Sequence, residues 1–304
     1  METHDATIPV TVISGYLGAG KSTLLNRLLS EEHGRRLAVV VNDFGSINID
    51  AQLIQSRDAA KINLANGCVC CSLGNDLATT LCELAASDTP PEQILVEASG
   101  VSQPAAVARG GHLPGLYTNA IFVLVDAANI RQLAGDKFVG TTVIRQLQQA
   151  GVLILNKVDL IDLPERASLR SWLAEQAPGV PVLETSHGEV ATALILDDEQ
   201  SLSMAAEPDL KHTHIHRTWS FETEAYIDEA ILTNFANTLP EGVLRAKGIV
   251  QLGPQRETTV YQQVGTYWNL TRCTQTNQKS QLVAIGYNDA LPPDWLEKVL
   301  SETA

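Results

Sequence analysis

A glycine-rich stretch near the start of the chain has the residue types and spacing of a phosphate-binding loop. The segment "GYLGAGKS" matches the pattern G-x-x-x-x-G-K-[ST], and it lies between the apolar run "VTVIS" and an amphipathic stretch. Glycines let the backbone wrap around a phosphate, and a helix that begins there adds positive potential. We expect Lys21 to reach the β- and γ-phosphates and Ser22 to bind Mg²⁺. The predicted nucleotide contacts of this loop are Gly15, Gly18, Ala19, Gly20, Lys21, Ser22 and Thr23.

A second motif, "NKVD", follows the apolar run "VLIL" and indicates which base the site accepts. Asp159 can accept two hydrogen bonds from N1–H and the exocyclic amine of guanine, whereas adenine offers no such pair, so ATP should be rejected. Asn156 would brace the loop or contact the base edge, and the stem of Lys157 would lie along the ring. In the later segment "TSHG", Ser186 is a further candidate guanine contact, and His187 is expected to be an incidental loop residue.

Acidic residues after two other apolar runs could complete a hydrolytic site. Glu97 ends the run "QILVE", where a carboxylate linked to Mg²⁺ belongs, and Gly100 could give its N–H to the γ-phosphate. Asp43 lies in "VNDFG", where it could approach Mg²⁺ or the attacking water, or could simply form a turn. The candidate catalytic residues are therefore Lys21, Glu97 and Asp43. Because no glutamine follows Gly100 in the place where Ras-type proteins hold their water-orienting residue, we expect slow intrinsic GTP hydrolysis.

Three of the five cysteines, Cys68, Cys70 and Cys71, stand within four positions in "NGCVCCSLG". Thiolates near a helix N-terminus have a lowered pKa, and three soft ligands on one loop suit Zn²⁺ or another first-row ion. Three sulfurs leave one position open, which suits an ion that is passed on. Buried inert thiols, a redox sensor and an iron–sulfur ligand set remain as alternatives. The predicted metal ligands are Ser22 and Glu97 for Mg²⁺, Cys68, Cys70 and Cys71 for the transition metal, and Asp43 for either Mg²⁺ or the transition metal.

Other cysteines and a set of histidines are weaker candidates. Cys82 lies in a helical pattern with Leu77, Leu81 and Leu84, and we interpret it as a core residue, while Cys273 is interpreted as structural. The segment "HTHIH" places His212, His214 and His216 at alternate positions, which in a strand would face one side. They form either an accessory metal site or a polar linker that runs into a strand.

The elements that must position these residues alternate between apolar runs and amphipathic stretches up to about residue 196. This alternation predicts an α/β fold: a P-loop GTPase domain over residues 1–196 with a mostly parallel sheet. Ligands of such sheets bind at the carboxyl ends of the strands, where the motifs lie. Residues 197–213 are polar and acidic and are interpreted as a linker. Several strands in series with a helix at each end then predict a smaller C-terminal α+β domain over residues 214–304.

Composition limits the classes of partner. The chain has 304 residues and a net charge of −14, which argues against general binding of nucleic acid or an anionic membrane. No apolar run approaches the roughly 20 residues that span a bilayer, and no basic region followed by an apolar core indicates a signal peptide. We therefore expect a cytoplasmic protein with reduced thiols. Whether copies of the chain form a homo-oligomer stays open.

The combination of "GYLGAGKSTLLNRLL", "VNDFG", "NGCVCCSL", "EASGVSQP" and "NKVDL" resembles the CobW-type P-loop GTPases, relatives of the hydrogenase and urease nickel-insertion G proteins. The segment "GVLRAKGIVQL" is similar to that family's C-terminal domain, so the resemblance extends over nearly the whole chain. It implies a metal-dependent GTPase that acts as a metallochaperone, with zinc or cobalt as the usual ion. It also implies phosphate and Mg²⁺ contacts at Lys21 and Ser22, guanine contacts at Asn156 and Asp159, and a metal loop at the three clustered cysteines.

Two departures from the family pattern stand out: Asp43 where many members have Glu, and three histidines where many have a long His-rich tract. The sequence as a whole predicts a GTPase that binds GTP or GDP with Mg²⁺ and couples the GTP cycle to transfer of Zn²⁺, or Co²⁺, to a client metalloprotein. The alternative is a regulatory G protein or redox sensor that uses the cysteine loop without delivering metal.

Overall fold

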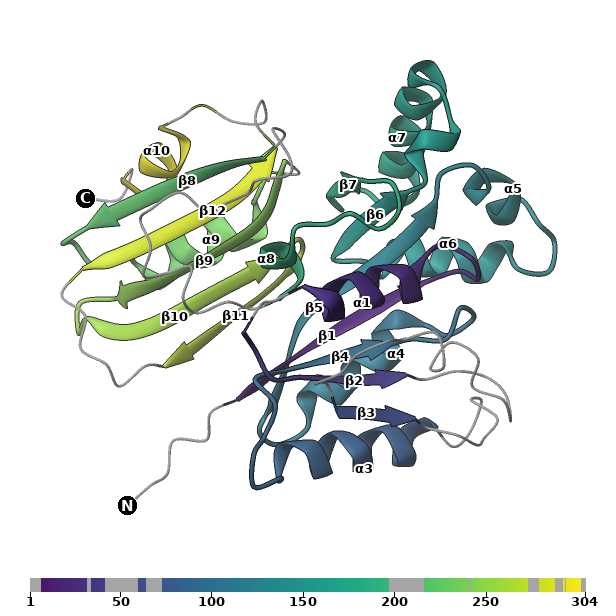
Figure 1. Ribbon diagram of the computed structural model, residues 1–304. Helices are drawn as coiled ribbons and strands as arrows, with labels where there is room; N and C mark the ends of the chain where they lie inside the picture. Colours follow the sequence, from purple (N-terminus) through teal and green to yellow (C-terminus); the bar gives the residue numbers. More distant parts are fainter. Residues whose placement is uncertain are drawn as a thin grey trace. The chain divides into compact units, whose positions relative to one another are not determined.

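The computed structural model describes residues 7–31, 34–41, 60–63, 73–196, 216–240, 242–272, 279–287, 292 and 294–301. The chain divides into two compact units, Met1–Leu196 and Asp197–Ala304, each with its own sheet (Figure 1). Among the described residues, no helix is long and apolar enough to cross a membrane.

The first unit is built on one parallel sheet of seven strands. In chain order these are β1 (Ile8–Gly15), β2 (Leu37–Val41), β3 (Ala60–Asn63), β4 (Gln93–Glu97), β5 (Leu116–Asp126), β6 (Val152–Asn156) and β7 (Val182–Glu184). Their order across the sheet is β3-β2-β4-β1-β5-β6-β7, and every neighbouring pair is parallel. Every residue of β1, β2, β4 and β6 is buried, as near-continuous aliphatic runs in a sheet covered on both faces require. The predicted α/β fold is confirmed.

Helices connect these strands and provide the crossovers that parallel pairing needs. They are α1 (Lys21–Ser30), α3 (Leu73–Ala85), α4 (Pro104–Ala108), α5 (Ile130–Ala134), α6 (Gly140–Gln148), α7 (Leu163–Gln176) and α8 (Thr192–Ile195), with 3-10 turns η1 (Arg109–His112) and η2 (Val158–Leu160). Local sequence fixes their ends. The Asp162 carboxylate accepts a hydrogen bond from the backbone N–H of Glu165 at 2.8 Å, and Pro164 follows in the first turn, so α7 begins there.

The interpretation of Cys82 as a core residue is wrong. Leu77, Leu81 and Leu84 of α3 are buried, but Cys82 is exposed. The leucines repeat at intervals of four and three residues and form one face of the helix, whereas Cys82 follows Leu81 by one residue and is turned about 100° away from it.

The second unit is an antiparallel sheet of five strands with two helices. The strands are β8 (His216–Thr223), β9 (Val243–Leu252), β10 (Glu257–Val264), β11 (Tyr267–Arg272) and β12 (Ser280–Tyr287), in the order β11-β10-β9-β12-β8. The helices α9 (Glu229–Asn237) and α10 (Trp295–Ser301) contribute Leu232, Phe235, Trp295 and Leu296 to a single core with Trp219 of β8. The predicted smaller α+β domain is therefore confirmed.

Candidate nucleotide-binding site

The phosphate loop joins β1 to α1, and its glycines are required by the backbone. Gly15 has φ +128°, and a Cβ there would lie 2.2 Å from the carbonyl oxygen of Leu124 on β5. Gly20 precedes α1 with φ +105°, and a Cβ there would meet the side-chain nitrogen of Asn156 at 2.4 Å. No side chain caps the start of α1. The N-terminal N–H groups of this ten-residue helix therefore face the loop, which is the arrangement that binds a phosphate.

Lys21 and Ser22 lie where the sequence motif expects them, at the first turn of α1. Lys21 is buried, with only 8% of its surface exposed, and its ammonium donates to the carbonyl oxygen of Gly15 at 3.1 Å. The Ser22 hydroxyl donates to Oε1 of Glu97 at 3.1 Å. Glu97 is 2% exposed at the end of β4, which pairs with β1 through Ile13. Neighbouring parallel strands thus bring the serine and the carboxylate together. Thr23 is exposed on α1.

The hydroxyl and carboxylate oxygens of Ser22 and Glu97 fit a magnesium ion. Mg²⁺ prefers hard oxygen ligands and uses one or two protein groups together with phosphate oxygens. This pair is next to the phosphate loop and includes a buried carboxylate, so its donor set has the required chemistry. Asp43, predicted to bind either Mg²⁺ or the transition metal, lies outside the described residues.

The loop after β4 approaches the phosphate loop at Gly100. A Cβ on Gly100 would lie 2.5 Å from Cδ2 and 3.0 Å from the backbone nitrogen of Leu17, so only glycine allows this close approach. The Ser102 hydroxyl and backbone N–H both donate to the carbonyl of Ser99, at 2.8 and 2.9 Å, and close a tight turn around Gly100. The predicted γ-phosphate contact is therefore next to the phosphate loop.

Asn156 joins the phosphate loop to the 185–188 loop. It is 2% exposed at the end of β6. Its Nδ2 donates to the carbonyl of Ala19 at 2.9 Å, and its Oδ1 accepts from the backbone N–H of Gly188 at 3.1 Å. Of the two roles proposed for Asn156 from sequence, this geometry favours the brace: the side chain holds the phosphate loop and the 185–188 loop together.

Lys157 and Asp126 form an ion pair beside this brace. Lys157 adopts φ +63°, and its Nζ lies 2.7 Å from Oδ2 of Asp126, the last residue of β5. Burial of the Asp126 carboxyl, the largest single effect, raises its pKa. Hydrogen bonds from Lys157, Asn129 and the Ala128 N–H together outweigh it and hold the pKa below its usual range. Asp126 is therefore a buried, charged anchor for Lys157.

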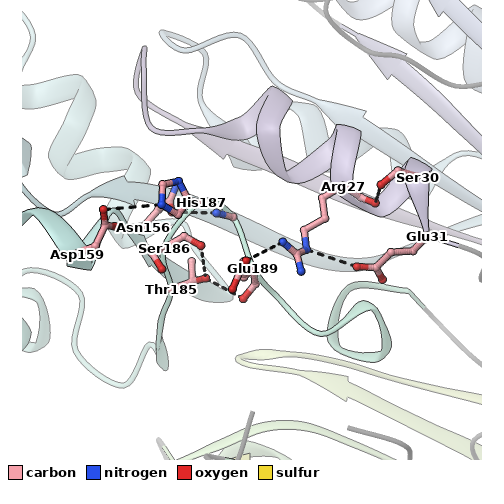
Figure 2. A network of polar contacts seen from close by, with 10 residues as sticks. Arg27, Ser30, Glu31, Asn156, Asp159, Thr185, Ser186, His187 and Glu189 are labelled. Carbon is pink, nitrogen blue, oxygen red and sulfur yellow. Dashed lines mark hydrogen bonds and ion pairs between the residues drawn. The ribbon is translucent and has the colours of Figure 1, made fainter. Parts of the chain in front are cut away.

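Asp159 and the 185–188 loop form the exposed rim of the site. Figure 2 shows the His187 ring directed toward Asp159, with Nε2 of the histidine 4.0 Å from Oδ2 of the carboxylate. The Asp159 side chain is 41% exposed, so a ligand can reach it. Ser186 is half-buried, and its carbonyl accepts from the Glu189 N–H at 3.0 Å. His187, expected to be incidental, is the described side chain that faces the proposed base acceptor.

A line of polar contacts links this rim to α1. Glu189 follows the 185–188 loop, and its carboxylate lies 3.1 Å from NH1 of Arg27 on α1. Arg27 in turn lies 3.5 Å from Glu31, and the chain of contacts is visible in Figure 2. The phosphate-binding helix and the base-side loop are thus connected by Asn156 in the interior and by Arg27 at the surface.

Reasoning from sequence missed two residues of this site, Asp126 and Gln146. Asp126 ends an apolar run immediately before the chain turns, and that position at a strand's carboxyl end was the available signal. Gln146 is buried on α6 and donates to two carbonyls of the loop that carries Gly100. No sequence pattern indicated it, because its partners are 44 and 46 residues away along the chain.

The metal-ligand predictions fall largely outside the described residues. Cys68, Cys70, Cys71, Cys273, His212 and His214 are not described, and of His216 only the backbone is described, as the first residue of β8. Within the ranges that the structure covers, no group of three or more His, Cys, Asp or Glu residues could hold a metal ion.

Comparison with known proteins gives two family matches and several relatives. Residues 9–184 match the CobW/HypB/UreG nucleotide-binding domain, and residues 216–304 match the cobalamin synthesis protein cobW C-terminal domain. The zinc chaperone CobW of a Sinorhizobium species is 25% identical over 94% of both chains. The zinc chaperone CobW of Pseudomonas aeruginosa is 29% identical over 86% of this chain and 81% of that protein.

Among solved structures, the Zn(II)-bound YjiA GTPase from Escherichia coli aligns with a TM-score of 0.48 and 20% identity, over 98% of this chain and 99% of that one. The first family match covers more than half of the chain, from Pro9 in β1 to the end of β7. The chain therefore belongs to the CobW/HypB/UreG family of nucleotide-binding proteins.

Proposed function

We propose that this protein is a GTPase that binds zinc and couples the GTP cycle to transfer of the ion to a client metalloprotein. Membership of a nucleotide-binding family supports the first half of the proposal. The second half is supported by two relatives, aligned over most of their length, that are both named zinc chaperones.

The observation that carries the nucleotide assignment is the pair of hydrogen bonds that the Asn156 side chain makes to two loops. One buried side chain holds the phosphate loop through Ala19 and the 185–188 loop through Gly188. The loops that would bind the two ends of a nucleotide are therefore set at a fixed separation before any ligand arrives. Such preorganisation lowers the free energy that ordering the loops would cost on binding.

The base in this proposal is guanine, recognised by Asp159. The Asp159 carboxylate would accept hydrogen bonds from N1–H and the exocyclic amine of guanine, and ATP would leave it unpaired. Lys157, held by Asp126, would place its aliphatic stem along the ring. Ser186 would add a contact from the 185–188 loop.

Ser22 and Glu97 would hold Mg²⁺, with Asp43 as a third candidate ligand. The ion would neutralise charge that develops on the phosphates during hydrolysis. Lys21 would neutralise charge on the β- and γ-phosphates from the other side, and the Gly100 N–H would bond the γ-phosphate. Because Val101, and not a glutamine that could orient water, immediately follows Gly100, intrinsic turnover is expected to be slow.

Cys68, Cys70 and Cys71 would bind the transported zinc as thiolates. Three sulfurs leave one tetrahedral position for a donor of the client, which allows the ion to be handed over. Cobalt as an alternative ion and a cytoplasmic location remain predictions.

Phosphate release and zinc transfer, measured in one preparation, test this function. We expect hydrolysis of GTP but not of ATP, and faster movement of bound zinc to a weak chelator during GTP turnover than with a non-hydrolysable GTP analogue. Cys70→Ser should abolish the zinc transfer and leave GTP hydrolysis intact. Hydrolysis with zinc transfer at the same rate in GTP and in the analogue would contradict metal delivery and favour a regulatory G protein or redox sensor.

A further inference from the structure

A buried glutamine on α6 holds the loop that carries Gly100. Gln146 is 2% exposed, and its Nε2 donates to the carbonyl oxygens of Gly100 at 3.1 Å and Ser102 at 2.9 Å. Both distances are in the normal range for N–H···O bonds, and an amide nitrogen has two hydrogens to give. The Gln146 amide therefore bridges the two ends of the tripeptide Gly100–Val101–Ser102.

A second glutamine extends this attachment. The backbone N–H of Ala105 donates to Oε1 of Gln149 at 3.2 Å, three residues after Gln146 along the chain. Gln149 directly follows the last residue of α6, and residues three apart at a helix end are neighbours on one side of it. The C-terminal end of α6 therefore holds the loop at Gly100 and the first turn of α4 at Ala105. Gln146 and Gln149 together are called the glutamine clamp below.

The glutamine clamp holds Gly100 on the side of α6, and the phosphate loop packs against Gly100 at Leu17. Leu17 approaches so closely that a Cβ on Gly100 would lie 3.0 Å from its backbone nitrogen. Gly100 therefore packs against Leu17 with no room for a side chain, and a move away from the phosphate loop would strain the hydrogen bonds from Gln146 to Gly100 and Ser102. We expect these limits to hold the Gly100 N–H at one distance from the phosphate loop. That distance matters only for a nucleotide with a γ-phosphate.

We propose that Gln146 is a positioning residue that lets the site distinguish GTP from GDP. The inference rests on the proposed GTPase function, and it assigns to α6 the control of the γ-phosphate loop. Removing the Gln146 donors would leave two buried carbonyls without these hydrogen bonds, and the loop would then sample positions in which the Gly100 N–H misses the phosphate. Contacts to the base, the ribose and the α- and β-phosphates would not change, because none of them involves this loop.

The test compares Gln146→Met, which keeps length and removes both donors, with Gln148→Met, the same change at an exposed position of α6. For Gln146→Met we expect a roughly tenfold loss of affinity for a non-hydrolysable GTP analogue, as losing buried hydrogen-bond donors predicts. Hydrolysis at saturating GTP should fall by about 10- to 100-fold, since displacement by about 1 Å has effects of that size. GDP affinity should stay at the wild-type value, and Gln148→Met should behave as wild type throughout.

Several outcomes would overturn the proposal. Equal losses of GDP and GTP-analogue affinity in Gln146→Met would mean general destabilisation, and no loss of either would mean that the clamp does not set the loop. If Gln146→Met does not fold, Gln149→Ala, which removes only the acceptor of the Ala105 N–H, carries the same test with a smaller selective loss. A wild-type protein that does not bind guanine nucleotides would refute the proposed function itself, which separates that failure from a failure of the clamp.

Discussion

At the scale of single residues, the choice of base depends on Asp159. Its carboxylate is reachable from solvent and is the proposed double acceptor for guanine. Asp159→Asn replaces one acceptor oxygen by a donor, so GTP affinity should fall by about 2–4 kcal/mol, the range for losing a desolvated charged hydrogen-bond partner. Displacement of a fluorescent guanine nucleotide measures this loss. Equal competition by ATP and GTP in the wild type would show that the site does not read guanine.

Lys21 is the proposed contact at the phosphate end of the nucleotide, opposite the base. Its ammonium lies against the carbonyl of Gly15, inside the phosphate loop, so its charge is already directed to where phosphates would bind. Lys21→Ala should abolish GTP hydrolysis and weaken nucleotide binding, because the charge stabilises the transferred phosphoryl group. Circular dichroism should remain native. Near-normal phosphate release from a natively folded variant would refute the role of Lys21.

Asp126 is predicted to act through Lys157. Asp126→Asn keeps the shape of the side chain and removes the charge that holds Lys157, so KM for GTP should rise several-fold while kcat stays unchanged. The matched variant is Lys157→Met, which keeps the stem without the ammonium. In a double-mutant cycle the two changes should be non-additive, since each removes the same ion pair. Additive effects would mean that Asp126 acts on the site by another route.

The lowered pKa of Asp126 predicts that the stability of the folded protein depends on pH. Its pKa is lower in the folded protein than in the unfolded chain, so as pH falls the unfolded chain binds a proton first. The contribution of Asp126 to stability is therefore present above about pH 4 and is lost as pH falls below it. Acid unfolding followed by circular dichroism should show a weaker dependence on pH near this value in Asp126→Asn than in the wild type.

At the scale of elements, the strands β1, β2, β4 and β6 could be predicted because each is a short, nearly continuous aliphatic run. The motif residues stand at or just after the carboxyl ends of these parallel strands, and those ends meet at one edge of the sheet. Lys21, Ser22, Glu97 and Asn156 therefore lie together in the fold. One error has a local cause: Cys82 follows the buried face of α3 by one residue and is therefore exposed. Gln146 could not be predicted, because its role depends on how α6 packs against a distant loop.

The helices of the second unit supply a prediction at this scale. Phe235 of α9 is 1% exposed, and its ring centroid lies 5.9 Å from that of Tyr261 and 5.7 Å from that of Trp295. Phe235→Ala should lower the free energy of unfolding of this unit by about 3–5 kcal/mol, as expected for removing a fully buried aromatic ring. Urea unfolding followed by tryptophan fluorescence measures it. Leu239→Ala, at a partly buried position beside the same core, should cost less and is the control.

At the scale of the whole molecule, we propose that two binding events are coupled: binding of GTP at the described site and binding of zinc at the cysteine loop. Cys68, Cys70 and Cys71 fall in the sequence between Asp43 and Glu97, the two residues predicted to respond to the γ-phosphate. If GTP orders the segments that carry Asp43 and Glu97, the three sulfurs would be held closer to the geometry of zinc ligands than in the GDP state. By linkage, any gain in zinc affinity from the GTP analogue must equal the gain in analogue affinity from zinc.

The most direct test of this coupling is a competition titration of zinc against a chelating dye, performed once with GDP and once with Mg²⁺ and a non-hydrolysable GTP analogue. The account predicts that zinc binds roughly 5- to 150-fold more tightly with the analogue, the range of typical coupling free energies of about 1–3 kcal/mol. In Cys70→Ser, both the tight zinc site and the difference between nucleotides should disappear while GTP still binds. Equal zinc affinity in the two nucleotide states of the wild-type protein would contradict the account.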